Sequence, residues 1–280
     1  MIKFFRHIRK SLLMENKTGK YFKYAIGEIL LVVIGILIAV QINTWNQNRN
    51  RLQLESVLLD QLKDELTEIY SDLNGDYTIL KLGRESNYRI EDYIDKDLPY
   101  NNNLSFDFYL INIDEYIYPK AAVYDKLKEE GLDIISNDTI RYLTRAVYES
   151  LFPRISRGNP FNPDISEFFK EYYHTNFKPN KDYSLQFMHI IPSDTLGSAI
   201  YQADTISYPI TFSTNGIKRK YTIGYHPLNF EALKKDAKFH MLLKQTTSFR
   251  DYKVGRYQMT KERVKELVRR IDIELKNKND

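Results

Sequence analysis

An apolar run near the N-terminus constrains this chain more than any other feature. Residues 25–42 form a stretch of 18 residues in which only Glu28 and Gln41 are strongly polar. As a helix this stretch would be roughly 27 Å long, close to the ~30 Å hydrocarbon core of a bilayer. A helix that packs into a protein core usually shows a polar stripe, and this segment has none. The sequence therefore predicts a transmembrane helix over residues 25–45.

A cleaved signal peptide is the main alternative for this segment. Signal peptides have an apolar core of ~7–15 residues followed by a cleavage site of the small-x-small type. The apolar run is longer than that here, and residues 37–40 (Leu-Ile-Ala-Val) make a poor cleavage site. An uncleaved single-pass anchor is the better interpretation.

Flanking charges predict how this helix is oriented. Residues 1–24 carry seven basic residues and one acidic residue, whereas the 18 residues after Trp45 carry three basic residues. Because basic residues concentrate on the cytoplasmic side of membrane proteins, we expect a cytoplasmic N-terminus in the bacterial inner membrane. Residues 46–280 then form a periplasmic domain. Tyr21, Tyr24 and Trp45 are the expected interfacial anchors.

The first 24 residues are predicted to lie on the inner leaflet as a basic amphipathic segment. Apolar residues at 4, 5, 8 and 12 share one helical face, opposite basic residues. A disordered basic tail is the alternative. The predicted inner-leaflet basic residues are Lys3, Arg6, Arg9, Lys10, Lys17, Lys20 and Lys23.

The charge and cysteine content exclude several classes of function. Residues 46–280 hold 34 of the 41 basic and 35 of the 37 acidic residues, a net charge of −1. The basic excess of the chain is therefore a topology signal, and no nucleic-acid partner is predicted. The chain has no cysteine, which excludes disulfides, zinc–thiolate sites and a thiol nucleophile.

Periodicity predicts a mainly α fold, in which the transmembrane helix continues into a helical bundle-like extracytoplasmic domain with one inserted β-hairpin. A leucine-rich stripe over residues 52–73 predicts that the first helix continues beyond the membrane. We expect it to end near Asn74-Gly75, and a second helix over 77–97 to pack back against it. Gly131 suits a helix C-cap, and Ser136 or Asn137 suits an N-cap. The Asn215-Gly216 pair predicts the hairpin. Further helices are expected at 139–152, 164–177, 228–247 and 250–276.

The N-terminal region resembles a known but uncharacterised family. YAIGEI at 24–29, LVVIGILIA at 31–39 and Q-x-N-x-W-N at 41–46 are similar to the N-terminal signature of single-pass membrane proteins from flavobacteria and other Bacteroidota, a domain-of-unknown-function family. Residues 124–141 and 229–245 are similar to later stretches of that family, whereas residues 179–227 depart from it. The resemblance implies a bacterial membrane protein with a mostly helical domain and supplies no activity or catalytic residue.

One face of the predicted membrane helix suggests an interface. At 100° per residue, Gly35 and Ala39 lie within about 20° of Glu28, and Leu31 lies near the same line. Small residues four apart permit close helix approach, and an acidic residue inside a membrane usually faces protein. We expect this face to contact a second copy or another membrane protein. The alternative is that Glu28 extends toward Lys20 or Lys23 at the membrane surface.

The sequence predicts no catalytic, cofactor-binding or metal-binding residue. Glu171 and His174 have the Glu-x-x-His spacing of di-metal bundles, but such sites need two of these motifs and only one is present. Nucleotide-binding, hydrolase and metalloprotease motifs are missing. We therefore favour a membrane-anchored protein-interaction or scaffold module. A ligand-sensing domain that signals through a partner is the alternative, and an enzyme with an unrecognised site is the least favoured hypothesis.

Overall fold

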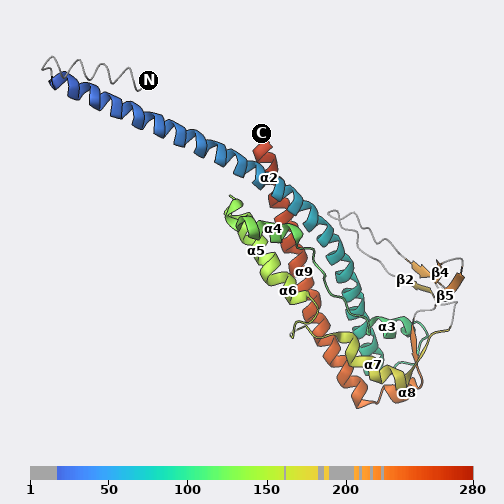
Figure 1. The fold of residues 1–280 in the computed structure, drawn as a ribbon. Coiled ribbons are helices and arrows are strands. Elements are labelled where there is room, and N and C mark those ends of the chain that lie inside the picture. The colour runs from blue at the N-terminus through green and yellow to red at the C-terminus, as the bar shows by residue number, and fades with distance from the viewer. Residues whose placement is uncertain are drawn as a thin grey trace. The chain divides into compact units, whose positions relative to one another are not determined.

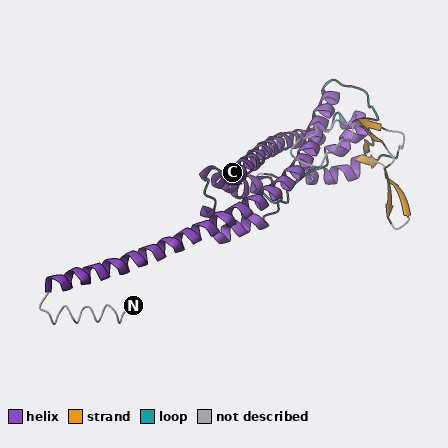
Figure 2. Ribbon diagram, turned by 90° about the horizontal axis from the view of Figure 1, so that it is seen from above, coloured by secondary structure: helices purple, strands orange, loops and turns teal. Residues whose placement is uncertain are grey.

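The structure, a computed structural model, describes residues 18–160, 162–181, 186–188, 205–207, 210–214, 217–221 and 224–279. The described chain is mainly helical, with short strands gathered in one region (Figures 1 and 2). It divides into two compact units, Met1–Ser56 and Val57–Asp280. Because this division falls at Ser56, it does not test the membrane boundaries predicted at residues 24/25 and 45/46.

The first described helix, α2, runs from Thr18 to Asp95 without a break. The predicted end at Asn74-Gly75 is therefore wrong, and so is the separate helix over 77–97. A glycine inside a helix is unfavourable by only ~1 kcal/mol, so burial of apolar residues on both sides can outweigh it. Leu73 and Leu80 are both fully buried, which carries the same buried stripe across Gly75.

The last helix, α9, Ala237–Asn279, packs along α2. Lys244 pairs with Glu91, and Lys63 pairs with Asp272, so 28 residues on α2 correspond to 28 residues on α9 in the opposite direction. Two helices that keep this register over that length are antiparallel neighbours. The predicted break between residues 247 and 250 is wrong, because α9 is continuous there.

Residues 122–155 form a chain of short helical segments, several of which pack alongside α9 (Figure 1). Asn137 caps α5, since its Oδ1 accepts from the backbone N–H groups of Thr139 and Ile140, which confirms one of the two predicted N-caps. Gly131, at φ 87°, ends the preceding helix as predicted. The segments are α4 (Ala122–Glu130), η1 (Leu132–Ile134), α5 (Asp138–Arg145), the π-helix η2 (Ala146–Leu151) and α6 (Phe152–Ile155).

Buried aromatic side chains form a core within the unit Val57–Asp280. Phe108, Phe169 and Phe239 are fully buried, and the centres of their rings lie 6.1–6.4 Å from those of neighbouring aromatic rings. Asp164 caps the helix that carries Phe169, close to the predicted start. Burial of side chains of this size stabilises the fold by ~1.5–3 kcal/mol each. The elements that supply this core are α3 (Leu104–Leu110), α7 (Ile165–Asn176), α8 (Phe230–Leu233) and α9.

The strands form three antiparallel pairs. β4 and β5 pair with Thr214 opposite Ile217, which confirms the hairpin predicted at Asn215-Gly216. The other two pairs were not predicted, because they join short strands that are far apart in sequence. The pairs are β1 (Phe177–Pro179) with β6 (Tyr225–Pro227), β2 (Gln186–Met188) with β3 (Thr205–Ser207), and β4 (Ile210–Thr214) with β5 (Ile217–Tyr221).

Candidate functional site

The apolar segment of α2 is exposed along its length. Among the described residues, α2 is the one helix long and apolar enough to cross a membrane, and none of its most apolar 18-residue window is buried. Leu31 is 69% exposed, Ala39 is exposed, and a Cβ atom added to Gly35 would meet no atom within 4 Å. Glu28 is half-buried. Contact of this face with a partner helix stays a prediction.

The predicted anchors are only partly within the described chain. The Trp45 side chain is 63% exposed, and the Arg49 guanidinium lies 5.9 Å from the centre of its ring. Tyr21 and Tyr24 belong to α2, as do Lys20 and Lys23, but their side chains lie outside the described part. The predicted basic residues between positions 3 and 17 also lie outside the described residues.

In the unit Val57–Asp280, two side chains of opposite charge form a buried ion pair. The side chains of Asp114 and Lys253 are 2% and 1% exposed, and Lys253 Nζ lies 2.5 Å from Asp114 Oδ1. The other carboxylate oxygen accepts from the Ile165 backbone N–H at 2.8 Å and from the Tyr116 hydroxyl at 2.9 Å. The pair therefore joins α7 and α9 to the segment after α3, and both carboxylate oxygens of Asp114 are already occupied by donors of the protein.

Arg250, one turn before Lys253, is fully buried as well. Its Nη2 donates to the carbonyl oxygens of Ile111 and Ile113, both at 3.0 Å. Its Nε and Nη1 have no hydrogen-bond partner among the described residues. Burial lowers the pKa of Arg250 to about 10, although Asp114 opposes that shift. The guanidinium packs against Gly83 of α2, where a side chain would leave it no room.

A second acidic group, Asp76, lies near the buried charges Asp114, Arg250 and Lys253, which together are called the polar seam. Burial first, and then the nearby Glu115 and Asp72, raise the pKa of Asp76 to about 7. The Tyr257 hydroxyl lies 3.5 Å from Asp76 Oδ2 and partly opposes that rise. Burial also raises the pKa of Glu115, and Asp114 adds to it. The charge of Asp76 therefore changes near neutral pH.

Sequence reasoning missed this polar seam, although a signal was present. The buried positions of α9 recur every three or four residues through Leu243, Thr246, Arg250, Lys253 and Tyr257. Charged residues at these positions fall on the stripe that faces the core, where lysine and arginine are rare unless they are paired. Their partners could not be read from the sequence, because Asp114 is 139 residues away along the chain.

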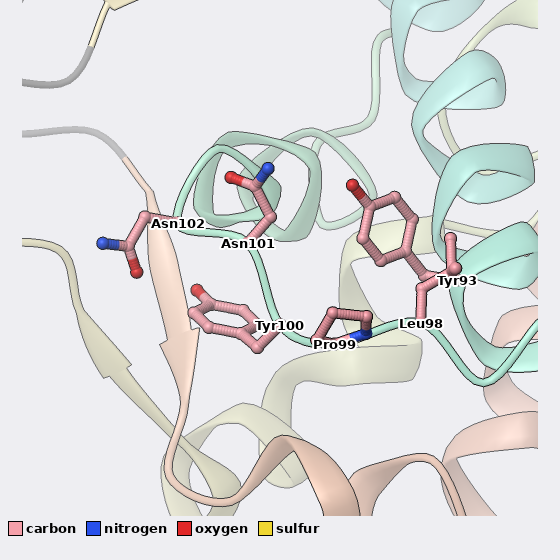
Figure 3. A pocket seen from close by; sticks show the side chains of 6 residues that line it. All are labelled: Tyr93, Leu98, Pro99, Tyr100, Asn101 and Asn102. Atoms are coloured by element: carbon pink, nitrogen blue, oxygen red, sulfur yellow. The ribbon is translucent and has the colours of Figure 1, made fainter.

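Two hollows on the described surface of the unit Val57–Asp280 are relevant to ligand binding. One, of about 690 Å³, lies over α5 and the π-helix, where Arg141 binds Asp138 and Arg145 lies 3.4 Å from Glu149. Those charges already neutralise one another. The other, of about 490 Å³, follows the end of α2 and is lined by Tyr93, Leu98, Pro99, Tyr100, Asn101 and Asn102 (Figure 3).

Hydrogen bonds fix one wall of the second hollow. The Tyr100 hydroxyl lies 2.5 Å from His226 Nδ1, and His226 Nε2 lies 3.0 Å from Asn180 Oδ1. Because an amide oxygen can only accept, His226 donates from Nε2 and accepts the Tyr100 proton at Nδ1. The Tyr100 ring also packs 5.2 Å from Phe230, so both its plane and its hydroxyl are held in place.

A metal centre finds no support in the described part of the chain. Glu171 and His174 are both exposed on α7. No group of three or more His, Asp or Glu side chains comes together there to hold a metal ion. His226 and His240 instead take part in local hydrogen bonds, the latter to the Lys234 carbonyl oxygen at 2.7 Å. His189 lies outside the described residues.

Comparison with known proteins gives one match. Residues 28–155 are similar to a family of unknown function, DUF6090. This segment covers α2 from Glu28 onward and continues to the end of α6, and it leaves out the strands and α9. No curated protein and no solved structure matches the chain. The match is consistent with the uncharacterised family expected from the sequence and assigns no activity.

Proposed function

We propose that this protein is a membrane-anchored interaction or scaffold module of the bacterial inner membrane, with a cytoplasmic N-terminus and a periplasmic helical domain. The exposed apolar segment of α2 carries the proposal, since burying it in a bilayer removes this surface from water. The polar seam supports a structural domain, because its buried carboxylate is already satisfied by protein donors. The resemblance to single-pass proteins of Bacteroidota supports the location.

Alkaline extraction of native membranes tests the anchor. A bilayer-spanning chain stays in the membrane pellet, whereas a peripheral protein is released into the supernatant. Release of the chain would contradict the anchor.

Cysteine labelling tests the orientation, because the chain has no cysteine of its own. We expect a membrane-impermeant maleimide, applied after the outer membrane is permeabilised, to label Ser248→Cys and to leave Ser11→Cys unlabelled until the inner membrane is broken. Ser248 is exposed on α9. The reverse labelling pattern would overturn the orientation.

The partner of the module is proposed to bind the face of Glu28, Leu31, Gly35 and Ala39. Small residues there permit close approach, and a hydrogen bond to Glu28 in the bilayer would add specificity. The double variant Glu28→Gln/Gly35→Leu should lose a co-purifying membrane partner, or its self-association, in mild detergent. Leu37→Phe adds bulk about 180° away on the helix and should keep it. An unchanged complex in the double variant would remove this interface from the proposal.

Ligand sensing is the second candidate, and the hollow of Figure 3 favours it. Its volume falls in the range of ~300–1,000 Å³ that is typical of small-molecule sites. The proposed cytoplasmic part is short, so a signal would have to pass through a membrane partner. Co-purification of a signalling protein, lost in the double variant, would favour this candidate over a scaffold.

A further inference from the structure

We propose that the hollow lined by Tyr93, Leu98, Pro99, Tyr100, Asn101 and Asn102 binds a neutral sugar, most simply a short oligosaccharide. This inference names a ligand class for the second candidate function, ligand sensing, and does not depend on membrane anchoring. It rests on three observations about the lining: the hydrogen-bonding groups that remain available, the charge, and the rigidity of one wall.

The first observation is that amide and hydroxyl groups at the hollow remain available. Asn101 Oδ1 accepts from the Asn103 backbone N–H at 2.9 Å, which leaves the Asn101 amide nitrogen as a donor. Within the described part of the chain, the Tyr93 hydroxyl and the Asn102 amide have no hydrogen-bond partner. Figure 3 shows the Tyr93 hydroxyl on the same side as the Asn101 amide, across a gap. Sugar hydroxyls both donate and accept, so they match amides and phenols.

The second observation is the charge of the hollow. None of its described lining residues is an acid, a lysine, an arginine or a histidine. The Lys234 ammonium donates to the Leu98 carbonyl oxygen at 3.3 Å, but it is also bound to Asp97 at 2.5 Å and Glu231 at 2.9 Å. Its charge is therefore neutralised locally. A phosphate, a carboxylate or an ammonium ligand would find no opposite charge in this hollow.

The third observation is that aromatic and apolar walls are held in place. The Tyr100 hydroxyl is engaged by His226, so the ring offers its apolar surface instead of a hydrogen bond. Tyr93 is partly buried and packs against the aromatic core. Pro99 restricts the backbone conformation of the loop between the Tyr93 and Tyr100 rings. Rigid aromatic surfaces with a few polar groups at the edge suit a ring that has apolar C–H faces and polar rims.

Binding of neutral trisaccharides tests the proposal. The full-length protein is purified in a detergent without a sugar headgroup, because a maltoside would compete. Saturation-transfer NMR and calorimetry then follow maltotriose, cellotriose and triacetylchitotriose, with trigalacturonic acid as the charged counterpart. We expect saturable binding of at least one neutral trisaccharide and weaker binding of the acid.

Matched variants locate the site. Asn101→Ala and Tyr93→Phe should each weaken binding about three- to tenfold, the effect of one lost hydrogen bond. Asn277→Ala and Tyr252→Phe make the same chemical changes at exposed positions of α9 and should leave binding unchanged. Asn102→Ala should weaken binding in the same way, and because Asn102 is exposed this change should not affect folding.

Three results would overturn the proposal: no saturable binding of any neutral trisaccharide, equal weakening by the α9 controls, or binding of trigalacturonic acid as tight as that of the neutral sugars. Alkaline extraction addresses only the anchor. A chain released from the membrane that still binds sugar would refute the anchor alone, and an anchored chain that binds no sugar would refute this inference alone.

Discussion

Among single residues, Asp114 and Lys253 form a buried ion pair within the unit Val57–Asp280. Lys253→Met would leave Asp114 buried without its cation, and removing one member of a buried pair destabilises a protein by ~3–5 kcal/mol. We expect a loss of that size in the free energy of unfolding, measured by chemical denaturation in detergent. Lys244→Met is the matched control, because that side chain is 69% exposed and its pair with Glu91 should contribute less than ~1 kcal/mol. Unchanged stability in Lys253→Met would contradict the role of the pair.

Asp76 makes stability depend on pH. Its pKa is about 7 in the folded chain against 3.8 as the ordinary value, so the folded state favours the protonated carboxyl. The stabilisation is complete below pH ~4 and is lost as pH rises through 7, because the unfolded state releases this proton earlier. Glu115 faces the same region and shifts in the same direction.

The measurement is the melting temperature at pH 5 and pH 8. We expect Asp76→Asn to melt higher than the wild type at pH 8 and close to it at pH 5. Asp92→Asn, at a side chain that is 63% exposed, is the control and should not change the difference between the two pH values. A wild-type chain that gains stability between pH 5 and pH 8, with no effect of Asp76→Asn, would contradict the assignment.

The residues of the candidate hollow were only partly accessible to sequence reasoning. The Pro-Tyr-Asn-Asn-Asn sequence of residues 99–103 favours a loop, and the structure has one there, with a turn at 102–103 that leads into α3. What the sequence could not supply is the support from His226 and Asn180, which are 126 and 80 residues away from Tyr100. A hollow is made by side chains that meet through the fold, so its existence depends on long-range packing.

At the scale of elements, the close approach of α2 and α9 depends on Gly83. A Cβ atom there would overlap Arg250 Nη1 and lie 3.2 Å from the Leu110 carbonyl oxygen. Glycine to alanine in a helix is normally stabilising by about 1 kcal/mol, but here steric overlap should reverse the sign and destabilise by ~1–3 kcal/mol. Gly255→Ala in α9 is the control: it meets no atom within 4 Å and should be neutral or stabilising. Thermal unfolding of both variants checks the difference in sign.

The helix boundaries show where sequence reasoning succeeded and where it failed. Capping residues act locally, so Asn137 and Gly131 marked their helix ends correctly. The hairpin at Asn215-Gly216 was equally local. The same Asn-Gly signal misled at residues 74–75, where the buried stripe of α2 outweighs the turn propensity. In α9, the Thr247 hydroxyl bonds to the Leu243 carbonyl oxygen and to Glu91 of α2, so the predicted break lies inside a continuous helix that contacts α2.

For the whole molecule, the division into two units makes a prediction about truncation. The unit Val57–Asp280 holds its own buried core, while the exposed apolar residues of α2 concentrate before residue 46. A fragment of residues 46–280 should therefore stay in the supernatant after ultracentrifugation without detergent and keep its helical circular dichroism. The full-length chain should sediment with membranes. Aggregation of the fragment would indicate that the N-terminal unit is needed for folding.

The antiparallel register of α2 and α9 also determines how long α2 exists during biosynthesis before the residues of α9 that pair with it are made. The paired residues are separated by 153 residues at Lys244 and by 209 at Asp272. A ribosome adds about 5–20 residues per second, so α2 waits about 8–40 s for α9 to be made. During that interval the face of α2 that α9 later covers stays open, and it is a natural target for a holding chaperone.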